Sequence, residues 1–301
     1  MGWEAYINNE IMNLKNIIII TFLISICIPN VRAQDINKYY FELNVANNLA
    51  KVGEIDSAIA TYEDAFKKRD FVSAFYFKKV LKLANLKKDK VRIEKYIQKI
   101  KKQSKGTNPY LKAIIDSLLK KDQEVRTALY VQRSAYAWKC DNKPNCNKQS
   151  KRYKRAKKYL DNWEKRDSLD TYFLLNLFKK YGFIGEELIG FDGYVNIITI
   201  LIHFDRDTNN AVLEPVLRKA LNEGKIWPID FAVIIDRHLK GDMKIQKYWL
   251  WPDFKSKKKY SFTKEDIPEI IKLRENIGIY DSSLRQEKRG KYWYLISKTN
   301  R

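Results

Sequence analysis

The chain has 301 residues, with 58 Lys and Arg against 36 Asp and Glu, which gives a formal net charge of +22. Hydrophobic residues make up 45% of it, a globular composition that excludes collagen, a pure coiled coil and wholesale disorder. With only 11 glycines and 7 prolines, glycine-rich phosphate loops and proline-rich linkers are scarce.

Residues 12–34 have the pattern of a secretory signal peptide. Lys15 precedes an apolar run from Ile17 to Ile28, and a Pro-Asn break then leads to Val31-Arg32-Ala33. The run is shorter than the roughly 20 residues that cross a bilayer. We expect cleavage after Ala33, with Met12 as a candidate initiator. The mature protein is then exported, to the periplasm or out of the cell, without a transmembrane segment.

Residues 34–105 form the first predicted structural region. From Tyr39 to Ile100 the apolar residues recur at helical spacing without strand-like alternation. Small and turn-forming residues fall on the spacing of a tetratricopeptide repeat, which the region therefore resembles: Ala46, Gly53, Ala58, Tyr62 and Ala65. The unit from 73 to 100 keeps few of these positions. A helical hairpin without repeat function explains the pattern equally well.

The segment 101–109 is charged and contains Gly and Pro, so it is the candidate boundary to a second domain over 106–285, which a basic tail over 286–301 follows. Helical patterns recur in this domain, at 110–138, 148–163, 170–181, 214–221, 229–240 and 263–277. Residues 194–204 have helical length but are rich in Ile and Val, so a strand is an alternative. The predicted fold is mostly α: a tetratricopeptide-like hairpin followed by a compact, mainly helical domain.

Two cysteines remain after export, Cys140 and Cys146, on either side of a Lys-Pro-Asn turn. In an oxidising compartment this spacing predicts a small disulfide loop. No His or further Cys lies nearby in the sequence, which disfavours zinc at this place.

The basic residues are clustered. Residues 148–159 hold seven Lys and Arg with two tyrosines, and 255–259 read KSKKK. Such runs attract polyanions by counterion release. An exported protein meets polysaccharide, lipid head groups or wall polymers before a genome, so nucleic acid is disfavoured as a partner. The alternative is a solvated helical face in a chain whose Lys, Ile, Asn and Tyr content reflects AT-rich codons.

Several polar residues stand in apolar surroundings. His203 ends the run 197–202, and Asp236 follows five apolar residues and precedes Arg237. A buried carboxylate at Asp236 needs a partner, for which Arg237, Arg126 or His203 qualifies. Asp122 and Arg126 share a helix face at i,i+4, and a further pair, Gln246 and Tyr248, would share a face in an extended segment. The alternative to a functional site is a hydrogen-bonded network that fixes helix packing.

The order of these residues resembles an uncharacterised domain family found in secreted proteins of Bacteroidetes-type bacteria. The resemblance covers about 110–281 and rests on the succession Asp122-Gln123 with Arg126, Tyr181-Gly182-Phe183, Gly190, His203, Gly224, Ala232, Asp236-Arg237, Gln246-x-Tyr248, Leu273-Arg274 and Ile277-Gly278-Ile279. It implies that the polar members converge, namely Asp122, Arg126, His203, Asp236, Arg237, Gln246 and Tyr248. It implies no reaction.

Two functions are compatible with the sequence. The first is a secreted binding or scaffold protein for a peptide, a protein or an anionic cell-surface polymer. The second is a hydrolase-like enzyme in which His203 and Asp236 act in acid/base roles. The chain lacks Gly-x-Ser-x-Gly, His-Glu-x-x-His, a Walker loop and Gly-x-Gly-x-x-Gly. Its only histidines are His203 and His238, which excludes a three-His metal site, and no cofactor or metal is expected.

Overall fold

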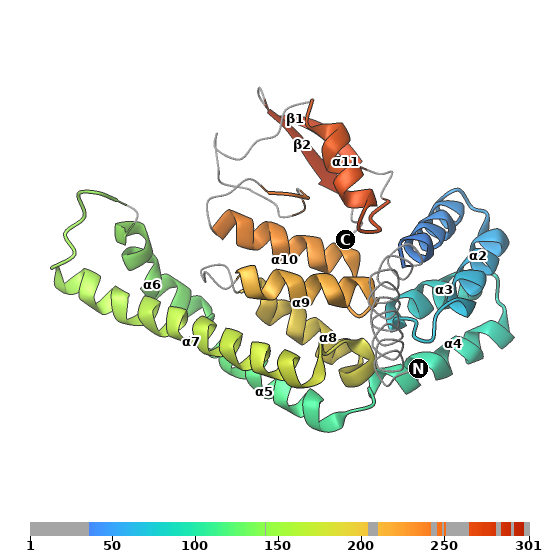
Figure 1. Ribbon diagram of the computed structural model, residues 1–301, viewed down its shortest axis with the longest axis horizontal. Coiled ribbons are helices and arrows are strands. Elements are labelled where there is room, and N and C mark those ends of the chain that lie inside the picture. Colours follow the sequence, from blue (N-terminus) through green and yellow to red (C-terminus); the bar gives the residue numbers. More distant parts are fainter. Residues whose placement is uncertain are drawn as a thin grey trace, which may run out of the picture.

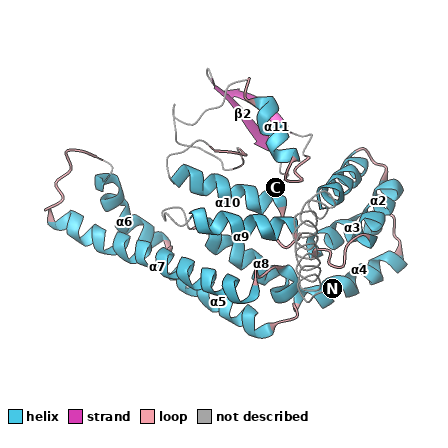
Figure 2. Cartoon of the chain, viewed as in Figure 1, coloured by secondary structure: helices cyan, strands magenta, loops and turns pink. Residues whose placement is uncertain are grey.

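The computed structural model describes residues 36–141, 143–203, 210–241, 246–248, 250, 265–280, 284–289 and 292–297. The predicted signal peptide, like the basic run at 255–259, lies outside these residues. The described chain is mostly helical, as predicted, and its strands are confined to one hairpin near the C-terminus (Figure 2). None of the described helices is long and apolar enough to span a membrane.

The N-terminal part consists of a helix over 36–51 and three further helices, α2 (Ile55–Lys67), α3 (Ala74–Leu86) and α4 (Lys90–Ser104). Gly53 turns the chain before α2 with a φ of 89°, a conformation that glycine adopts without strain. Ala46, Ala58 and Ala65 are fully buried, so the helices approach closely there. The turn and the small residues agree with the predicted helical hairpin.

The next region packs helices around the largest apolar core. Its elements are α5 (Pro109–Glu124), α6 (Ala128–Asp141), α7 (Lys151–Tyr181), α8 (Glu186–Ile202), α9 (Asn210–Asn222) and α10 (Pro228–Gly241). Residues 194–202 are helical, so the strand alternative does not hold for them. Each fully buried Leu or Ile of this core contributes about 1.5–3 kcal/mol to the free energy of unfolding.

The connection between the two parts is tightly packed. The N–H groups of Thr107 and Asn108 both donate to the carbonyl of Leu188, at 3.0 and 2.8 Å. Gly190 kinks α8 with a φ of 73°, and a Cβ there would lie 2.4 Å from the carbonyl oxygen of Ser104. These contacts hold the connection between the two apolar cores against α8.

The pattern over 110–138 predicts one helix, whereas the structure has α5 and α6 with a turn between them. The side-chain oxygen of Thr127 accepts the N–H of Tyr130, which caps α6 at a new start. Conversely, two predicted segments form one helix, α7, whose first turn is capped by Ser150 and which ends at Gly182. Helical periodicity alone does not locate such caps.

The far ends of α6 and α7 project from the rest of the molecule (Figure 1). We call residues 128–165 the arm. It has its own small core of Ala137, Cys140, Tyr153, Ala156 and Leu160. The predicted disulfide joins Cys140 to Cys146 next to this core, with a Cα–Cα distance of 5.3 Å.

The chain continues into α11 (Ile267–Glu275) and a hairpin of β1 (Leu284–Arg289) and β2 (Tyr292–Ser297). The strands are antiparallel, with Leu284 opposite Ser297 and Arg289 opposite Tyr292. The residues assigned from the sequence to a basic tail therefore include most of this hairpin. Gly278 follows α11 with a φ of 85°, as expected for a residue that ends a helix.

Candidate functional site

The first group of predicted residues surrounds the carboxylate of Asp122, at the end of α5. His203, which follows α8, lies with its Nδ1 2.9 Å from Oδ2 and 3.1 Å from Oδ1. Arg126 donates to Oδ1 from Nε at 3.0 Å and from Nη2 at 2.8 Å, and Gln123 donates to Oδ2 at 2.7 Å. Both carboxylate oxygens are thus saturated with donors.

Asp122 is ionised in this setting. Its side chain is 1% exposed, and burial opposes the charged form, but the hydrogen bonds from His203 and Arg126 outweigh burial and hold the pKa below its ordinary value. An ionised acceptor requires that His203 carries a proton on Nδ1. The imidazole is 22% exposed, so it lies at the boundary between the polar cluster and solvent.

Further charged side chains lie next to Asp122, on α7. Arg126 also pairs with Asp167, and its guanidinium stacks over the ring of Trp163 at 5.0 Å from the centroid. One turn further, Asp170 accepts from Nε of Arg166 at 2.9 Å, and burial raises the pKa of Asp170. The carboxylates and guanidiniums where α5, α6 and α7 meet are therefore paired with one another.

The second group is built around Asp236 on α10, which is fully buried. Its Oδ1 accepts the backbone N–H groups of Lys247 and Tyr248, both at 2.8 Å, and its Oδ2 accepts that of Leu250 at 2.7 Å. Burial raises the pKa of Asp236 to about 6, although these donors favour the charged form. Asp236 thus anchors a loop to α10.

The remaining predicted residues belong to this second group. Gln246 and Tyr248 are 3% and 1% exposed, and the carbonyl of Tyr248 accepts from Nε of the buried Arg274 at 2.7 Å. Arg237 is half-buried on α10. In the described hydrogen bonds, His203 contacts the carboxylate of Asp122, whereas the carboxylate of Asp236 accepts backbone N–H groups of the loop 247–250. For Asp236, Gln246 and Tyr248 this geometry favours the packing alternative.

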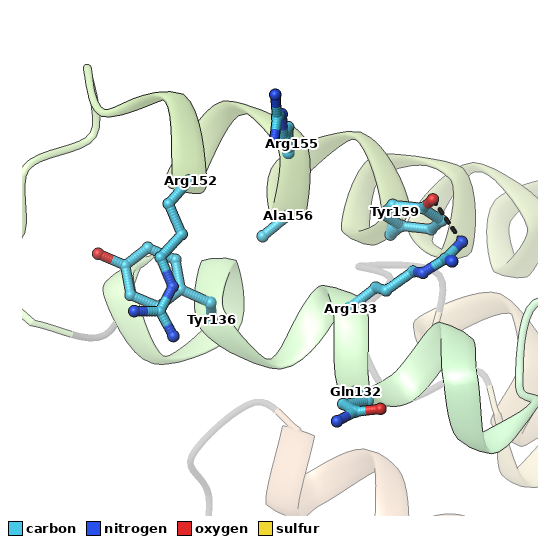
Figure 3. A pocket seen from close by; sticks show the side chains of 7 residues that line it. All are labelled: Gln132, Arg133, Tyr136, Arg152, Arg155, Ala156 and Tyr159. Carbon is cyan, nitrogen blue, oxygen red and sulfur yellow. Dashed lines mark hydrogen bonds between the residues drawn. The ribbon is translucent and has the colours of Figure 1, made fainter.

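A third group lies on the arm, and the sequence carries a signal for only half of it. A pocket of about 550 Å³ is lined by residues of α6 and α7: Gln132, Arg133, Tyr136, Arg152, Arg155, Ala156 and Tyr159. Arg152 reaches from α7 over the ring of Tyr136, and Arg133 reaches from α6 to Tyr159, so the two pairs cross the helix seam in opposite directions (Figure 3). Ala156 leaves space between them.

The tyrosines hold these guanidiniums in place. The Arg152 guanidinium carbon lies 4.2 Å from the Tyr136 centroid, and that of Arg133 lies 5.2 Å from the Tyr159 centroid. Arg133 Nη1 also donates to the Tyr159 hydroxyl at 2.7 Å. A stacked guanidinium keeps its remaining N–H donors at its edge, where they can bind an anion in bidentate fashion.

The acidic residues of the arm are directed elsewhere. The arm holds eleven Lys and Arg but only three acidic residues, Asp141, Asp161 and Glu164. All three lie within 4 Å of the amine of Lys157, on another face of α7. Among the described residues, no carboxylate lines the pocket or forms an ion pair with its arginines. The pocket is therefore a site of uncompensated positive charge.

The chain matches no protein-family model, no curated protein and no solved structure. The described residues also include no group of three or more His, Cys, Asp or Glu side chains that could hold a metal ion. The geometry of the three groups is therefore the basis for any functional argument. The sequence signal for the arm pocket was the basic run on α7, whereas its α6 half carries no comparable signal.

Proposed function

We propose that the protein is an exported binding protein that recognises an anionic polymer through the arm. The observation that carries this proposal is the arm pocket, which is lined by Arg133, Arg152 and Arg155 and by no carboxylate of the part of the chain that the structure describes. Charge-assisted hydrogen bonds to such donors are about twice as strong as neutral ones. The surrounding excess of basic residues adds a long-range attraction.

Export is part of the proposal. The apolar segment after Lys15 and the small residue at Ala33 support a cleaved signal. The Cys140–Cys146 disulfide supports an oxidising compartment, where such bonds persist. In that compartment the available anionic partners are polysaccharides, lipid head groups and wall polymers, of which the first and last are polymers.

Retention on immobilised heparin, eluted with a salt gradient, tests the binding function. The Arg152→Gln/Arg155→Gln variant removes two exposed charges from the pocket. The control, Lys154→Gln/Lys158→Gln, removes two exposed charges from the same helix outside it. The pocket variant should elute at clearly lower salt than the control, and the salt dependence of its affinity should be shallower. Equal elution of the two variants would refute a specific pocket.

A second candidate function is favoured by the bond between His203 and Asp122. A histidine whose Nδ1 is held by an ionised carboxylate presents its other nitrogen for acid/base chemistry, as in hydrolases. Asp236 was the orienting carboxylate expected from the sequence. In the proposed site Asp122 takes this role, because His203 contacts Asp122 whereas Asp236 accepts backbone N–H groups. If the protein cleaves the polymer that it binds, new chain ends will appear with the wild type and with Asp236→Asn. They will not appear with a folded His203→Gln.

A further inference from the structure

The pocket is the outer end of a longer row of side chains along one side of the α6–α7 seam. Going inward from the pocket, Tyr130 packs edge-on against Tyr159 with centroids 5.0 Å apart, and its hydroxyl accepts from Nδ2 of Asn162 at 3.1 Å. Arg126 and Trp163 follow. We call these residues the seam row: Arg152, Tyr136, Arg133, Tyr159, Tyr130, Asn162, Trp163 and Arg126.

The spacing of the row explains its continuity. On α6, Tyr130 and Arg133 are three residues apart, and on α7 the row residues Arg152, Tyr159 and Trp163 recur at intervals of seven and four. Arg126 lies in the turn before α6 and joins the row through its stack on Trp163. These intervals keep each set on one helix face. From Arg152 to Trp163 the row extends about 16 Å along α7, at 1.5 Å per residue. This length exceeds that of a single sugar ring.

The charge of the row changes along its length. The outer end has two arginines, Arg152 and Arg133, and among the described residues no carboxylate forms an ion pair with either of them. The middle is neutral, with the Tyr130 hydroxyl and the exposed amide of Asn162. At the inner end Arg126 is committed to Asp122 and Asp167. A polymer with a charge on every unit would place anions against this neutral middle and against the carboxylates beyond it.

The seam row therefore points to a linear glycan with widely spaced acidic groups, and we infer that such an acidic oligosaccharide is the ligand of the arm. This inference rests on the proposed function and specifies its ligand. One carboxylate or sulfate of the glycan binds the arginines of the pocket. The neutral sugars that follow lie along Tyr130 and Asn162, which offer an aromatic edge, a hydroxyl and an amide. Polyphosphate and nucleic acid, which are charged at every unit, fit this pattern less well.

The test compares soluble probes by calorimetry at physiological ionic strength. The probes are a hyaluronan octasaccharide, which has one carboxylate per two sugars, its disaccharide, a neutral chitin oligosaccharide, and a linear phosphate oligomer with the same charge as the octasaccharide. We expect the octasaccharide to bind at least tenfold more tightly than the disaccharide and the phosphate oligomer. The neutral oligosaccharide should bind weakest.

Two variants separate this inference from the proposed function. Tyr130→Phe/Asn162→Ala alters the middle of the row and should lower octasaccharide affinity several-fold, while leaving disaccharide affinity unchanged. Arg152→Gln/Arg155→Gln should weaken every anionic probe. If the phosphate oligomer binds as tightly as the octasaccharide, or if affinity does not depend on chain length, the inference fails while the binding function stands. If the Arg152/Arg155 variant binds all probes like the Lys154/Lys158 control, the proposed function fails as well.

Discussion

The Nδ1–H of His203 donates to the carboxylate of Asp122, 81 residues earlier in the chain, at 2.9 Å. This bond connects the C-terminal end of α8 to that of α5, two helices that pack side by side in the main core. Arg126 binds the same carboxylate, so the removal of either Asp122 or His203 strands a polar partner in a largely buried place. The bond is therefore part of the packing of the domain, whatever chemistry His203 performs.

A double-mutant cycle measures this bond. Asp122→Asn and His203→Gln should each lower the free energy of unfolding by about 1–3 kcal/mol, because each leaves buried groups without their partners. The coupling energy between them should lie in the range of about 0.5–3 kcal/mol for contacting residues. Urea unfolding of the wild type, both single variants and the double variant gives the value.

The matched control for this cycle is the pair Asp116 and Asn196, which joins the same two helices at 2.8 Å but has a carboxylate that is 41% exposed. The coupling energy of this control pair should be clearly smaller than that of Asp122 and His203, because exposed polar pairs contribute less. A coupling energy for Asp122 and His203 that is no larger than that of the control pair would contradict a tight ionic hydrogen bond.

The sequence predicted the helices because their apolar spacing is a local property, and the disulfide because its cysteines are close in the chain. It identified Asp122 and His203 as polar residues in apolar segments, and it placed Asp236 next to His203 as one candidate partner. The actual partner could not be predicted, since it depends on which helices pack together. The same holds for the α6 half of the arm pocket: Arg133, Tyr136 and Gln132 form no run or motif, and they gain meaning only opposite α7.

The pH dependence of stability should reveal Asp236. Its pKa is about 6 in the folded protein and about 3.9 in an unfolded chain. Between these values the folded state binds the proton more tightly, so the Asp236 contribution to the free energy of unfolding falls as pH rises through this window. At 1.36 kcal/mol per pKa unit the full change is roughly 3 kcal/mol.

Asp236→Asn removes this titration, and the measurement is the difference between wild-type and variant unfolding free energies from pH 4 to pH 7. We expect the advantage of the wild type to shrink by about 2–3 kcal/mol over that range. Asp56→Asn, at a side chain that is 77% exposed, controls for the loss of one negative charge. Parallel wild-type and Asp236→Asn profiles would show that the carboxyl is not perturbed.

Glu186 connects the two parts of the molecule. It is 2% exposed at the start of α8, and its Oε1 accepts the N–H of Ala74, the first residue of α3, at 2.7 Å. Burial raises the pKa of its carboxyl, so the charged form is costly in this position. Glu186→Gln keeps an oxygen for the Ala74 N–H without a charge, whereas Glu186→Ala loses the acceptor.

At pH 7 we expect Glu186→Ala to lower the free energy of unfolding by about 1–2 kcal/mol, as for the loss of a helix cap. Glu186→Gln should be as stable as the wild type or more stable. Thermal and urea unfolding of the three proteins side by side checks the order. If the glutamine variant is as unstable as the alanine variant, the charge of Glu186 is required and the interpretation of its burial is wrong.

The close approach between α8 and the residue that ends α4 depends on Gly190. Its φ of 73° is unfavourable for other residues, and an added Cβ would lie 2.4 Å from the backbone oxygen of Ser104. Gly53 has a similarly positive φ of 89°, but a Cβ there would meet no atom of the described residues within 4 Å. A comparison of alanine substitutions at the two glycines therefore separates the effect of backbone strain from that of steric overlap.

Gly53→Ala should lower the free energy of unfolding by about 1–2 kcal/mol, the penalty of a Cβ in the left-handed region. Gly190→Ala should cost a further 1–3 kcal/mol or so, because the backbone of Ser104 has to move. Chemical unfolding of both variants measures the difference, and limited proteolysis after Lys101, Lys102 or Lys105 shows whether the connection to α8 has loosened. Faster cleavage is expected only for Gly190→Ala. Equal losses of stability at the two positions would mean that residues 104–108 yield to the added methyl group, so that the connection between the two cores is not fixed by this contact.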